Sequence, residues 1–384
     1  MPELTTLHVA YLTASDPENP HAWSGIHYSA ITELRKHFGS VTALGPHEEK
    51  NLVFRGRAKS FLLSKLTGKR FDYRHSLQLA RAYGKHFSAQ LKKGKYDLIF
   101  AVAASTELTY LETDLPVYYT ADATFENMVD YYPYYSKLSS RSRREGHKVQ
   151  QFALDKCTRL FFPSEWAARS ASAEYGIAEN KINIIPFGAN LKELPAHATD
   201  VVINPEEVVN LLFVGVEWKR KGGQVALDAF RELKKRGRNV RLTIVGCSPD
   251  VQEEGIEIIS FIDKKIDAQR KRLYGLFARA HFFILPTTAE CFGLVFCEAS
   301  AFGTPSLAPH TGGVGGAIVN GENGFLFVPG AGGKEYADKI ELLINHPAEY
   351  AALRKKSRAL YDAKLNWTVW GNTIAASVSA AHSR

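Results

Sequence analysis

Cysteine is scarce in this 384-residue sequence, and its four cysteines form no CxxC pair and no Cys/His spacing suited to a metal. The sequence therefore gives no sign of a zinc site or a dithiol redox centre, and reduced structural thiols are expected. Long apolar runs are also absent, since none approaches the ~18 residues of a membrane-spanning helix. The first residues, MPELTTLHVAYLTASDP, lack the basic and apolar regions of a signal peptide, so the expected location is the cytoplasm.

Charge is present but is distributed unevenly along the chain. The formal net charge is +8, and residues 50–95 contain thirteen Lys and Arg residues against a single acidic residue, Asp72. Within this segment, FRGRAKSFLLSKLTGKRFDYRH mixes basic and apolar residues and is compatible with a basic amphipathic helix. Such a helix either packs on a domain core with a solvated basic face, or docks on an anionic membrane surface or other anionic partner.

The length and composition indicate two globular domains. A chain of 384 residues exceeds one ordinary domain, and two domains of roughly 150–200 residues are the natural expectation. A composition of 45% hydrophobic and 23% charged residues provides material for two cores. The polar, proline-containing residues 192–208 are suited to a linker, so the expected domains are residues 1–195 and 205–365.

Short apolar runs alternate with amphipathic segments of helix length, and this alternation restarts after the linker. The pattern predicts two similar α/β domains, each with a parallel sheet that helices cover on both faces. The strands are expected at residues 7–13, 40–45, 96–104, 115–123 and 158–164 in the first domain, and at 209–217, 240–248, 256–263 and 280–288 in the second. Open sheets of this kind bind ligands at the carboxyl ends of their strands, and two facing domains would enclose a cleft.

Two segments that follow predicted strands are suited to holding an anion. Gly25 precedes a predicted helix, where a glycine lets backbone amides approach an anion, and an ordinary turn glycine is the alternative. The second segment, FVGVEWKRKGG at residues 213–223, is not a Walker A loop but places Arg220 and Lys221 just before two glycines and a helix. A planar guanidinium beside an ammonium suits a diphosphate, and a solvated basic loop is the alternative.

Two glutamates bracket an almost entirely apolar stretch, TAECFGLVFCEASAFGTPSLA, at residues 288–308. Glu290 is expected in a strand-to-helix loop, and Glu298 within a helix that ends at Gly303. A carboxylate within an apolar helix needs a partner, so Glu298 is expected to pair with sugar or ribose hydroxyls or with a buried arginine. The N-terminus of this helix should present unpaired amides to a ligand. The residues assigned to these amides are Cys291, Phe292, Gly293 and Leu294.

One further carboxylate follows a predicted strand, this time in the first domain. Asp122 lies within YYTADATFE, at the point where the strand gives way to a short helix. The ordinary explanation is that Asp122 caps that helix, and contact with a bound ligand is the functional explanation. Asp122 therefore joins the candidate site residues.

Taken together and in order, these segments resemble the retaining nucleotide-sugar glycosyltransferases of family 4. The E-x7-E pattern after a strand ending in proline is similar to theirs, and FVGVEWKRKGG resembles their phosphate-binding loop. NIIPFGAN at residues 183–190 resembles the family segment that precedes the linker, and FGTPSLAPHTGGVGGAIVNGENGFLF at residues 302–327 resembles a later glycine-rich stretch. The resemblance covers nearly the whole chain.

The resemblance implies the GT-B fold, an α/β architecture in which two Rossmann-like domains face each other across a cleft. It also implies that a C-terminal helix, here residues 366–384, returns to the first domain. The implied reaction transfers a hexosyl group from a nucleotide-diphosphate sugar to a hydroxyl acceptor with retention of configuration. In it, Glu298 would bind the ribose hydroxyls, and Glu290 would hold the donor sugar. The other residues implied in donor binding or catalysis are Arg220, Lys221, Asp122, Gly25, Ile262, Cys291, Phe292, Gly293 and Leu294.

Three departures from the family pattern affect these roles. Val216 stands where many members have an arginine after the phosphate-loop glycine, so neutralisation of the diphosphate falls to Arg220 and Lys221. Ala121 stands where a histidine is common, and Gly316 stands where an acidic residue is usual. The sequence contains no DxD triplet, which forms the metal site of the other large transferase fold, so neither a metal nor another cofactor is expected.

The expected partners follow from the same resemblance. The donor is expected to be a UDP-sugar in preference to GDP-mannose, with Ile262 placed where the family backbone pairs with the base. The acceptor is an unknown hydroxyl compound, and the basic residues 50–95 suggest one that is anionic or is associated with the inner face of a membrane. Alternatives on the same fold are a nucleotide-sugar epimerase, a phosphorylase or a non-catalytic sugar-nucleotide-binding protein. Nucleic-acid binding is not expected, because RNP-like and aromatic-interleaved motifs are absent.

Overall fold

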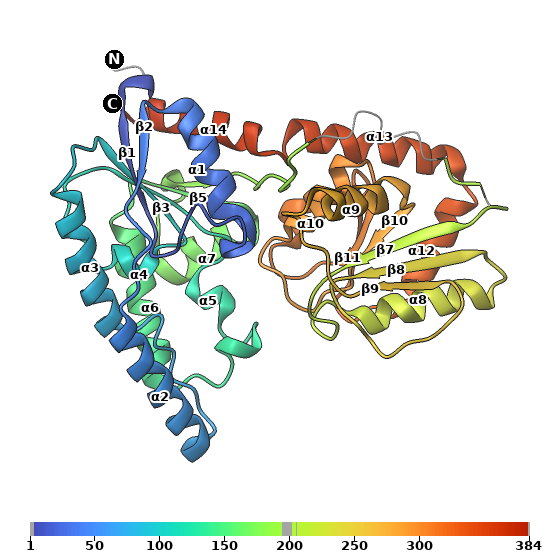
Figure 1. The fold of residues 1–384 in the computed structure, drawn as a ribbon, viewed down its shortest axis with the longest axis horizontal. Coiled ribbons are helices and arrows are strands. Elements are labelled where there is room, and N and C mark those ends of the chain that lie inside the picture. The colour runs from blue at the N-terminus through green and yellow to red at the C-terminus, as the bar shows by residue number, and fades with distance from the viewer. Residues whose placement is uncertain (1–3, 194–201, 205, 383–384) are drawn as a thin grey trace. The chain divides into compact units, whose positions relative to one another are not determined.

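The computed structural model describes residues 4–193, 202–204 and 206–382, which form two compact units. The first unit contains the chain up to Pro186 together with the C-terminal helix, and the second contains Phe187–Asn366. Figure 1 shows the helices and strands of each unit. The expected linker, residues 192–208, lies largely outside the described residues. Within the described residues, no helix is both long enough and apolar enough to cross a membrane.

The first unit is built on a six-stranded parallel sheet in the order β2-β1-β3-β4-β5-β6. Its strands are β1 (His8–Leu12), β2 (Ser40–Ala43), β3 (Leu98–Val102), β4 (Val117–Thr120), β5 (Arg159–Phe162) and β6 (Ile182–Ile184). Its α-helices before the C-terminal one are α1 (Ile26–His37), α2 (Lys50–Thr67), α3 (Leu77–Leu91), α4 (Ser105–Leu108), α5 (Phe125–Met128), α6 (Ser140–Asp155) and α7 (Glu165–Tyr175). The strand order reverses between β1 and β3, which makes the carboxyl ends of these strands a place where a ligand can bind.

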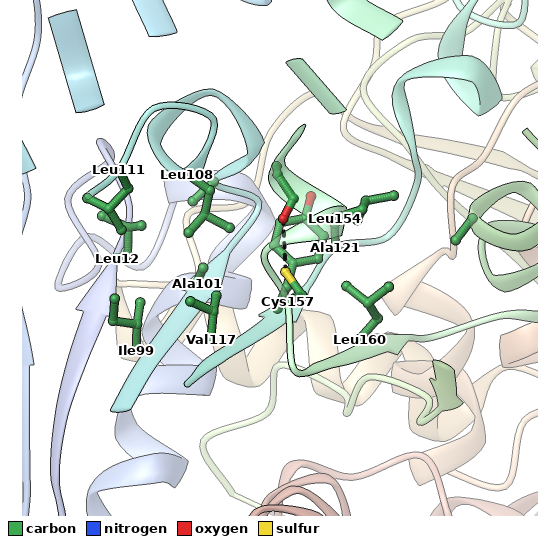
Figure 2. Close-up of a cluster of buried hydrophobic side chains, with 14 of the residues drawn as sticks. Leu12, Ile99, Ala101, Leu108, Leu111, Val117, Ala121, Leu154, Cys157 and Leu160 are labelled. Atoms are coloured by element: carbon green, nitrogen blue, oxygen red, sulfur yellow. Dashed lines mark hydrogen bonds between the residues drawn. The ribbon is translucent and has the colours of Figure 1, made fainter. Parts of the chain in front are cut away.

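Alternate residues of β3 face opposite sides of this sheet, as the two-residue period of a strand requires. Ile99 and Ala101 lie in a cluster of buried apolar side chains that includes residues of α3, α4, α6 and α7. Figure 2 shows part of this cluster, with Leu108 of α4 and Leu154 of α6 beside the strands. All five residues of β3 are buried, which explains why its sequence is apolar throughout rather than alternating.

The C-terminal helix, α14 (Trp367–His382), covers part of the other face of the first sheet. Phe100 of β3 meets the indole ring of Trp370 edge-on, with 6.0 Å between the ring centroids. Trp370 is fully buried, and α14 also packs on α1. Gly371 permits this close packing, because a Cβ atom at that position would lie 2.3 Å from the Cγ atom of Glu33 on α1. The return of the C-terminal helix to the first domain is therefore confirmed.

The second unit is built on another six-stranded parallel sheet, in the order β12-β11-β10-β7-β8-β9. Its strands are β7 (Val209–Val214), β8 (Val240–Val245), β9 (Ile256–Ile259), β10 (Phe282–Ile284), β11 (Ser306–Pro309) and β12 (Gly324–Phe327). Its helices are α8 (Gly223–Lys235), α9 (Asp267–Arg279), α10 (Leu294–Ala301), α11 (Val314–Ala317), α12 (Gly333–Ile344) and α13 (Pro347–Ala363). The strand order reverses between β7 and β10, as it does in nucleotide-binding Rossmann sheets.

The expected α/β fold is confirmed, and every predicted strand is present, but three strands were not predicted. These strands, β6, β11 and β12, contain only three or four residues each. β6 has the apolar sequence INI but is only three residues long, and no residue of it is fully buried. Proline ends β11 and glycine begins β12, and both residues are disfavoured in strands. Pairing with neighbouring strands, rather than local sequence, places these three segments in the sheets.

The boundary between the units differs from the expected one. Phe187, which was expected in the first domain, packs its ring on Phe292 with 5.5 Å between the ring centroids. The amide of Ala189 donates a hydrogen bond to the carbonyl oxygen of Leu365 at 3.0 Å. The second unit therefore begins at Phe187, and the first domain does not extend to residue 195.

The basic segment does form a helix, α2, whose apolar residues pack on the core only near its N-terminus, where Leu52 contacts the buried cluster. Among its eighteen residues only Val53 and Gly56 are buried. Phe61, Leu62 and Leu66 are all exposed large apolar side chains. The expectation of a helix is confirmed. The alternative in which the helix packs on the domain core holds for its N-terminal turns, through Leu52 and Val53, and fails for the exposed residues Phe61, Leu62 and Leu66.

Trp370→Ala should destabilise the first unit, because it removes a fully buried indole between α14 and β3. Truncation of a buried Trp to Ala typically costs about 3–5 kcal/mol. The matched control is Asn372→Ala, an exposed position on the same helix, for which a change within about 0.5 kcal/mol is expected. Urea unfolding followed by fluorescence and circular dichroism would measure both variants. Equal unfolding midpoints would show that α14 does not stabilise the first unit.

Candidate active site

Two loops of the second unit meet where the strand order reverses. Residues 215–222 join β7 to α8, and residues 285–293 join β10 to α10. Because β7 and β10 are neighbouring parallel strands, their carboxyl ends lie side by side. Thr288 connects the loops, since its amide and its hydroxyl both donate hydrogen bonds to the carbonyl oxygen of Arg220, at 2.8 and 3.1 Å. The backbone of one loop is thus held against the other.

Gly222 makes this close approach possible. Its φ of +73° lies in the left-handed region, and a Cβ atom built there would lie 1.8 Å from the carbonyl oxygen of Pro286. No other residue type fits that position without moving the loops apart. Gly222 is also the N-cap residue of α8, so the glycine pair that the sequence singled out shapes both the helix start and the contact between loops.

Three of the predicted residues come together in this contact. Lys221 forms an ion pair with Glu290, and the Nη1 atom of Arg220 lies 4.0 Å from the Oε2 atom of Glu290. Arg220 also donates to the carbonyl oxygen of Ala289 at 2.8 Å and to the carboxylate of Glu217 at 2.8 Å. These hydrogen bonds from Arg220 lower the pKa of Glu217. The solvated-loop alternative is therefore wrong, since the side chains of Arg220 and Lys221 are only 16% and 12% exposed.

The helix that follows Glu290 begins later than the sequence suggested. Gly293 is the N-cap residue of α10, with a φ of +91°, and Leu294 is the first helical residue. Cys291 and Phe292 lie before the helix and are not part of its first turn, so the assignment of their amides to the helix N-terminus is wrong. The amides of the first turn come from Leu294 and the residues after it. The carbonyl oxygen of Glu290 accepts a hydrogen bond from the amide of Gly313 at 3.0 Å, which connects this loop to the glycine-rich stretch.

Glu298 finds a partner that was not predicted. The side chain of Glu298 is 5% exposed, and its Oε1 atom accepts a hydrogen bond from the Nζ atom of Lys264 at 2.6 Å. Lys264 lies between β9 and α9, in the same loop as Ile262. A half-buried lysine thus stands in place of the buried arginine that was one of the two expected partners, and the other, a sugar or ribose hydroxyl pair, stays a prediction. Only the chain topology, which brings the loop after β9 to α10, could have identified Lys264. Within the described part of the chain, no group donates a hydrogen bond to the second oxygen of Glu298, Oε2.

The first unit has its own strand-order reversal, and a buried carboxylate joins its two loops. Glu107 of α4 accepts a hydrogen bond from the amide of Ala14 at 2.9 Å, which connects the loops that follow β3 and β1. Burial raises the pKa of Glu107. Gly25 is the N-cap residue of α1 with a φ of +83°, a conformation that favours glycine. His27, the second residue of this helix, hydrogen bonds to Tyr11 at 3.1 Å, and burial lowers the pKa of His27 to about 4.

Asp122 lies in the loop between β4 and α5, at the carboxyl end of its strand as predicted. It does not cap α5. Thr124 does so, since the Thr124 hydroxyl accepts from the amide of Asn127 at 3.3 Å and the Asn127 side chain accepts from the amide of Thr124 at 3.0 Å. The capping explanation for Asp122 is therefore wrong, and a ligand role for Asp122 stays a prediction. Gly25 and Asp122 follow β1 and β4, which are separated by β3.

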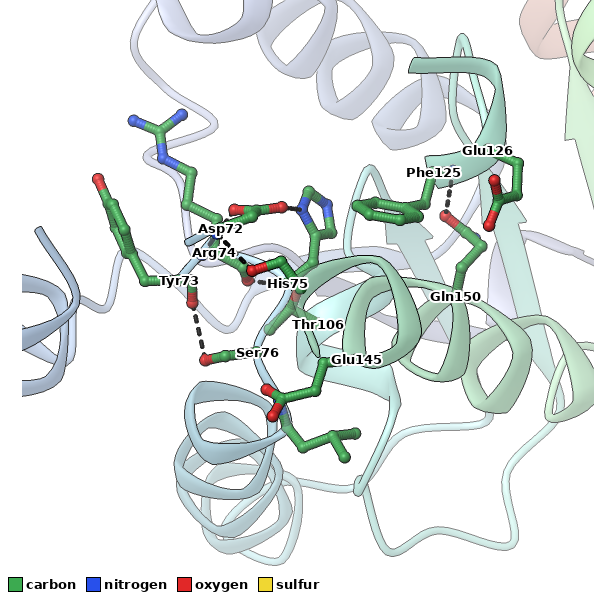
Figure 3. Close-up of polar contacts among 12 residues, drawn as sticks. Asp72, Tyr73, Arg74, His75, Ser76, Thr106, Phe125, Glu126, Glu145 and Gln150 are labelled. Carbon is green, nitrogen blue, oxygen red and sulfur yellow. Dashed lines mark hydrogen bonds and ion pairs between the residues drawn. The ribbon is translucent and has the colours of Figure 1, made fainter. Parts of the chain in front are cut away.

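A polar cluster at the start of α3, which Figure 3 shows, was not predicted from the sequence. The buried carboxylate of Asp72 contacts the Nδ1 atom of His75 at 2.7 Å and accepts a hydrogen bond from the amide of Arg74 at 3.0 Å. Burial alone would raise the pKa of Asp72, but the charge of His75 and these hydrogen bonds lower it. The ring of His75 lies 5.2 Å from that of Phe125, in the helix that follows the Asp122 loop. A D-x-x-H spacing in a loop was the available signal.

The fold and these sites together define a class of protein. The chain has two Rossmann-like units. At its strand-order reversal, the second unit has a cationic loop, a glutamate and a helix N-terminus, which are the features of a GT-B protein that binds a nucleotide sugar. Comparison with known families gives the same answer. Glycosyltransferase Family 4 matches residues 31–193, and Glycosyl transferases group 1 matches residues 200–360. The chain belongs to the family-4 glycosyltransferases.

Curated relatives carry the name D-inositol 3-phosphate glycosyltransferase. The one from Pseudarthrobacter chlorophenolicus is 29% identical over 250 residues, a match that covers 60% of this chain and 57% of the relative. The one from Rhodococcus opacus is 31% identical over 196 residues, which covers 47% of this chain and 44% of the relative. The chain thus spans about half the length of the curated relatives it matches.

Solved structures with the same fold cover nearly the whole chain. Sucrose-phosphate synthase from Thermosynechococcus elongatus has a TM-score of 0.68 at 16% identity, with 98% of this chain and 99% of that chain covered. Anabaena HepE, solved in complex with UDP and glucose, has a TM-score of 0.62 at 18% identity, with 97% and 99% covered. At these identities the likeness establishes the GT-B fold.

Gly222→Ala should separate the two loops of the second unit. The expected cost is about 1–2 kcal/mol for the left-handed backbone and about 1–3 kcal/mol more for the clash with Pro286. The matched control is Gly237→Ala, which has a similar φ of +79° but no heavy atom within 4 Å of the added Cβ atom. Thermal unfolding should therefore show a larger loss for Gly222→Ala. An equal loss in both variants would mean that the close approach to Pro286 contributes nothing.

Proposed function

We propose that the protein is a retaining glycosyltransferase that moves a hexosyl group from a UDP-sugar to a hydroxyl acceptor. The observation that carries the proposal is the cluster of Arg220, Lys221 and Glu290 at the strand-order reversal of the second sheet. The two cations can bind a diphosphate, and the carboxylate can accept hydrogen bonds from sugar hydroxyls. Membership of family 4, and relatives named as glycosyltransferases, support the same reaction.

Glu298 is proposed to bind the ribose of the nucleotide. Its Oε1 atom accepts a hydrogen bond from Lys264, which fixes the orientation of the carboxylate, and Oε2 is left to accept a hydrogen bond from a hydroxyl. Ile262 lies two residues before Lys264, so the backbone of the same loop is proposed to pair with the base. A uracil nucleotide is favoured over a guanine nucleotide because HepE, which has the same fold, is solved with UDP-glucose.

In the proposed reaction the acceptor oxygen forms a bond to the anomeric carbon while the bond from that carbon to the diphosphate oxygen breaks on the same face. The leaving diphosphate takes the proton from the acceptor hydroxyl, so charge and atoms balance. Arg220, Lys221 and the first-turn amides of α10 stabilise the negative charge that develops on the diphosphate. Glu290 orients the sugar, and the scheme requires no metal ion. Cys291, Phe292 and Gly293 form the backbone turn that lies against the sugar and phosphate.

The acceptor is proposed to bind the first unit and to be anionic or attached to a membrane. The basic residues 50–95 provide the positive charge that such an acceptor needs. Asp122 and His75 place polar groups at the carboxyl end of the first sheet, where an acceptor hydroxyl can be oriented. The acceptor in the name of the curated relatives, inositol 3-phosphate, is itself anionic. Attachment to the membrane would be peripheral.

The function is tested first by donor binding and then by transfer. Thermal shift with UDP-glucose, UDP-N-acetylglucosamine and GDP-mannose should give the largest stabilisation for a UDP-sugar, about 2.7 kcal/mol at 100 times its dissociation constant. UDP release should then increase when inositol 3-phosphate is supplied as a trial acceptor, with and without EDTA. Conversion of the donor to another nucleotide sugar without any acceptor would identify an epimerase instead. Strict dependence on Mg²⁺ or Mn²⁺ would contradict the metal-free scheme.

Glu298→Ala and Glu290→Ala should separate binding from turnover. Loss of the Glu298 carboxylate should weaken UDP binding by about 1–3 kcal/mol, because a buried hydroxyl pair loses its acceptor. Loss of the Glu290 carboxylate should reduce the rate of transfer more than it weakens UDP binding. Glu322→Ala, an exposed glutamate of the same unit, is the control and should leave both quantities unchanged. Wild-type binding and turnover in both site variants would show that the assignment of these glutamates is wrong.

A further inference from the structure

The helix α2 has an unusual surface for a helix of a globular domain. Phe54, Phe61, Leu62 and Leu66 are 74%, 62%, 58% and 82% exposed, so four large apolar side chains lie in water on one helix. In Figure 1 the C-terminal half of α2 extends beyond the sheet and the other helices of the first unit. A helix of this length with two buried residues gains little from packing. Its exposed apolar surface therefore suits contact with another phase or another molecule.

Three of the four exposed apolar residues share one side of α2, opposite the side that contacts the domain, and Leu66 lies beyond the edge of that side, between Arg55 and Lys59. A Cβ atom at Gly56 would lie 2.4 Å from the Cβ atom of Tyr73, which shows that the Gly56 side of the helix faces the domain. At 3.6 residues per turn, Phe54, Phe61 and Leu62 fall within an arc of about 100° centred opposite Gly56. The apolar stripe therefore points away from the first unit, and no rearrangement is needed to expose it.

Basic residues flank this stripe. The sequence of α2 contains five Lys and Arg residues and no acidic residue. Arg55 and Lys59 lie along one edge of the stripe, Arg57 lies along the other, and Lys65 lies within the stripe. Among the residues that the structure describes, none forms an ion pair with the three side chains at the edges, while Lys59 lies 3.9 Å from the centre of the Phe71 ring and Arg57 donates to the hydroxyl of Tyr73 at 3.3 Å. The positive charge is therefore available to an external partner.

The exposed apolar residues and the basic residues of α2 together favour an anionic lipid surface over a second copy of the chain. A second copy of the chain would bring the same positive charge against α2, and the two helices would repel each other. An anionic lipid surface satisfies both features at once, since apolar side chains enter the region between headgroups and acyl chains while basic residues meet the headgroups. We propose that α2 docks on an anionic membrane surface, with Phe54, Phe61, Leu62 and Leu66 facing the acyl chains. This deepens the peripheral attachment proposed above, and it does not depend on the identity of the donor.

The docking is tested by co-sedimentation with vesicles of phosphatidylcholine alone and of phosphatidylcholine mixed with phosphatidylglycerol. The full chain should bind the anionic vesicles at low salt, bind the neutral vesicles weakly, and lose most of its binding at high salt. Arg55→Gln/Arg57→Gln/Lys59→Gln should weaken binding on the order of 100-fold, because each basic residue near an anionic surface contributes about fivefold. Phe61→Ser/Leu62→Ser/Leu66→Ser should weaken binding to a similar extent through loss of the apolar contact.

A matched control distinguishes docking through α2 from nonspecific adsorption of exposed apolar side chains to vesicles. Val328→Ser/Leu342→Ser removes two exposed apolar side chains from the second unit and should leave vesicle binding unchanged. Hydrogen exchange tests the docking on the wild-type chain itself, because the backbone amides of α2 should exchange more slowly when anionic vesicles are added. Absence of binding to anionic vesicles at low salt, or equal losses in the control and the α2 variants, would overturn the proposal.

Two further outcomes have distinct meanings. A dimer in solution that Phe61→Ser/Leu62→Ser/Leu66→Ser dissociates would show that a second copy, and not a lipid surface, covers the stripe. Thermal shift with UDP checks the transferase proposal separately, because the α2 variants should bind UDP as the wild-type chain does. Vesicle binding without UDP binding would leave the docking proposal standing while the transferase proposal fails, and the reverse result would do the opposite.

Discussion

Contact between two loops of the second unit determines where its charged groups lie. The carbonyl oxygen of Arg220 accepts two hydrogen bonds from Thr288, and Gly222 lies so close to Pro286 that no side chain fits between them. Once the two backbones are held in this way, the side chains of Lys221 and Glu290 lie close enough to form an ion pair. The charged cluster is therefore a consequence of backbone packing at the strand-order reversal, and side-chain attraction is secondary to it.

Pairing also explains how cations can remain in a largely buried position. Arg220 and Lys221 are each mostly covered, and an unpaired buried charge would be strongly destabilising. Glu217 and Glu290 compensate for them in the free protein. A diphosphate that enters the site would compensate part of the positive charge of Arg220 and Lys221 in place of these carboxylates. Binding would then replace one anionic partner with another and would leave neither cation unpaired. Glu298 and Lys264 follow the same rule at the α10 end of the sheet.

The first unit differs between its sheet and α2 in how its polar and apolar side chains are covered. Near the carboxyl end of its sheet, two buried carboxylates are satisfied within the protein, Glu107 by the amide of Ala14 and Asp72 by His75. On α2 the reverse holds, since apolar side chains such as Leu66 are left in water and basic residues lie beside them. These two carboxylates are thus covered by the protein, whereas the apolar side chains of α2 are not.

The sequence by itself determined the α/β fold, all the strands of five or six residues and the order of the motifs, because apolar periodicity and glycine positions are local properties of the chain. It also identified Arg220, Lys221, Glu290 and Glu298. Tertiary structure alone decided their partners, since Lys264 lies 34 residues from Glu298 and meets it only through the strand order. It likewise added the short strands β6, β11 and β12, and it turned the apolar side of α2 outward. Helical periodicity places apolar residues on one side of a helix, but only packing determines which side faces the core.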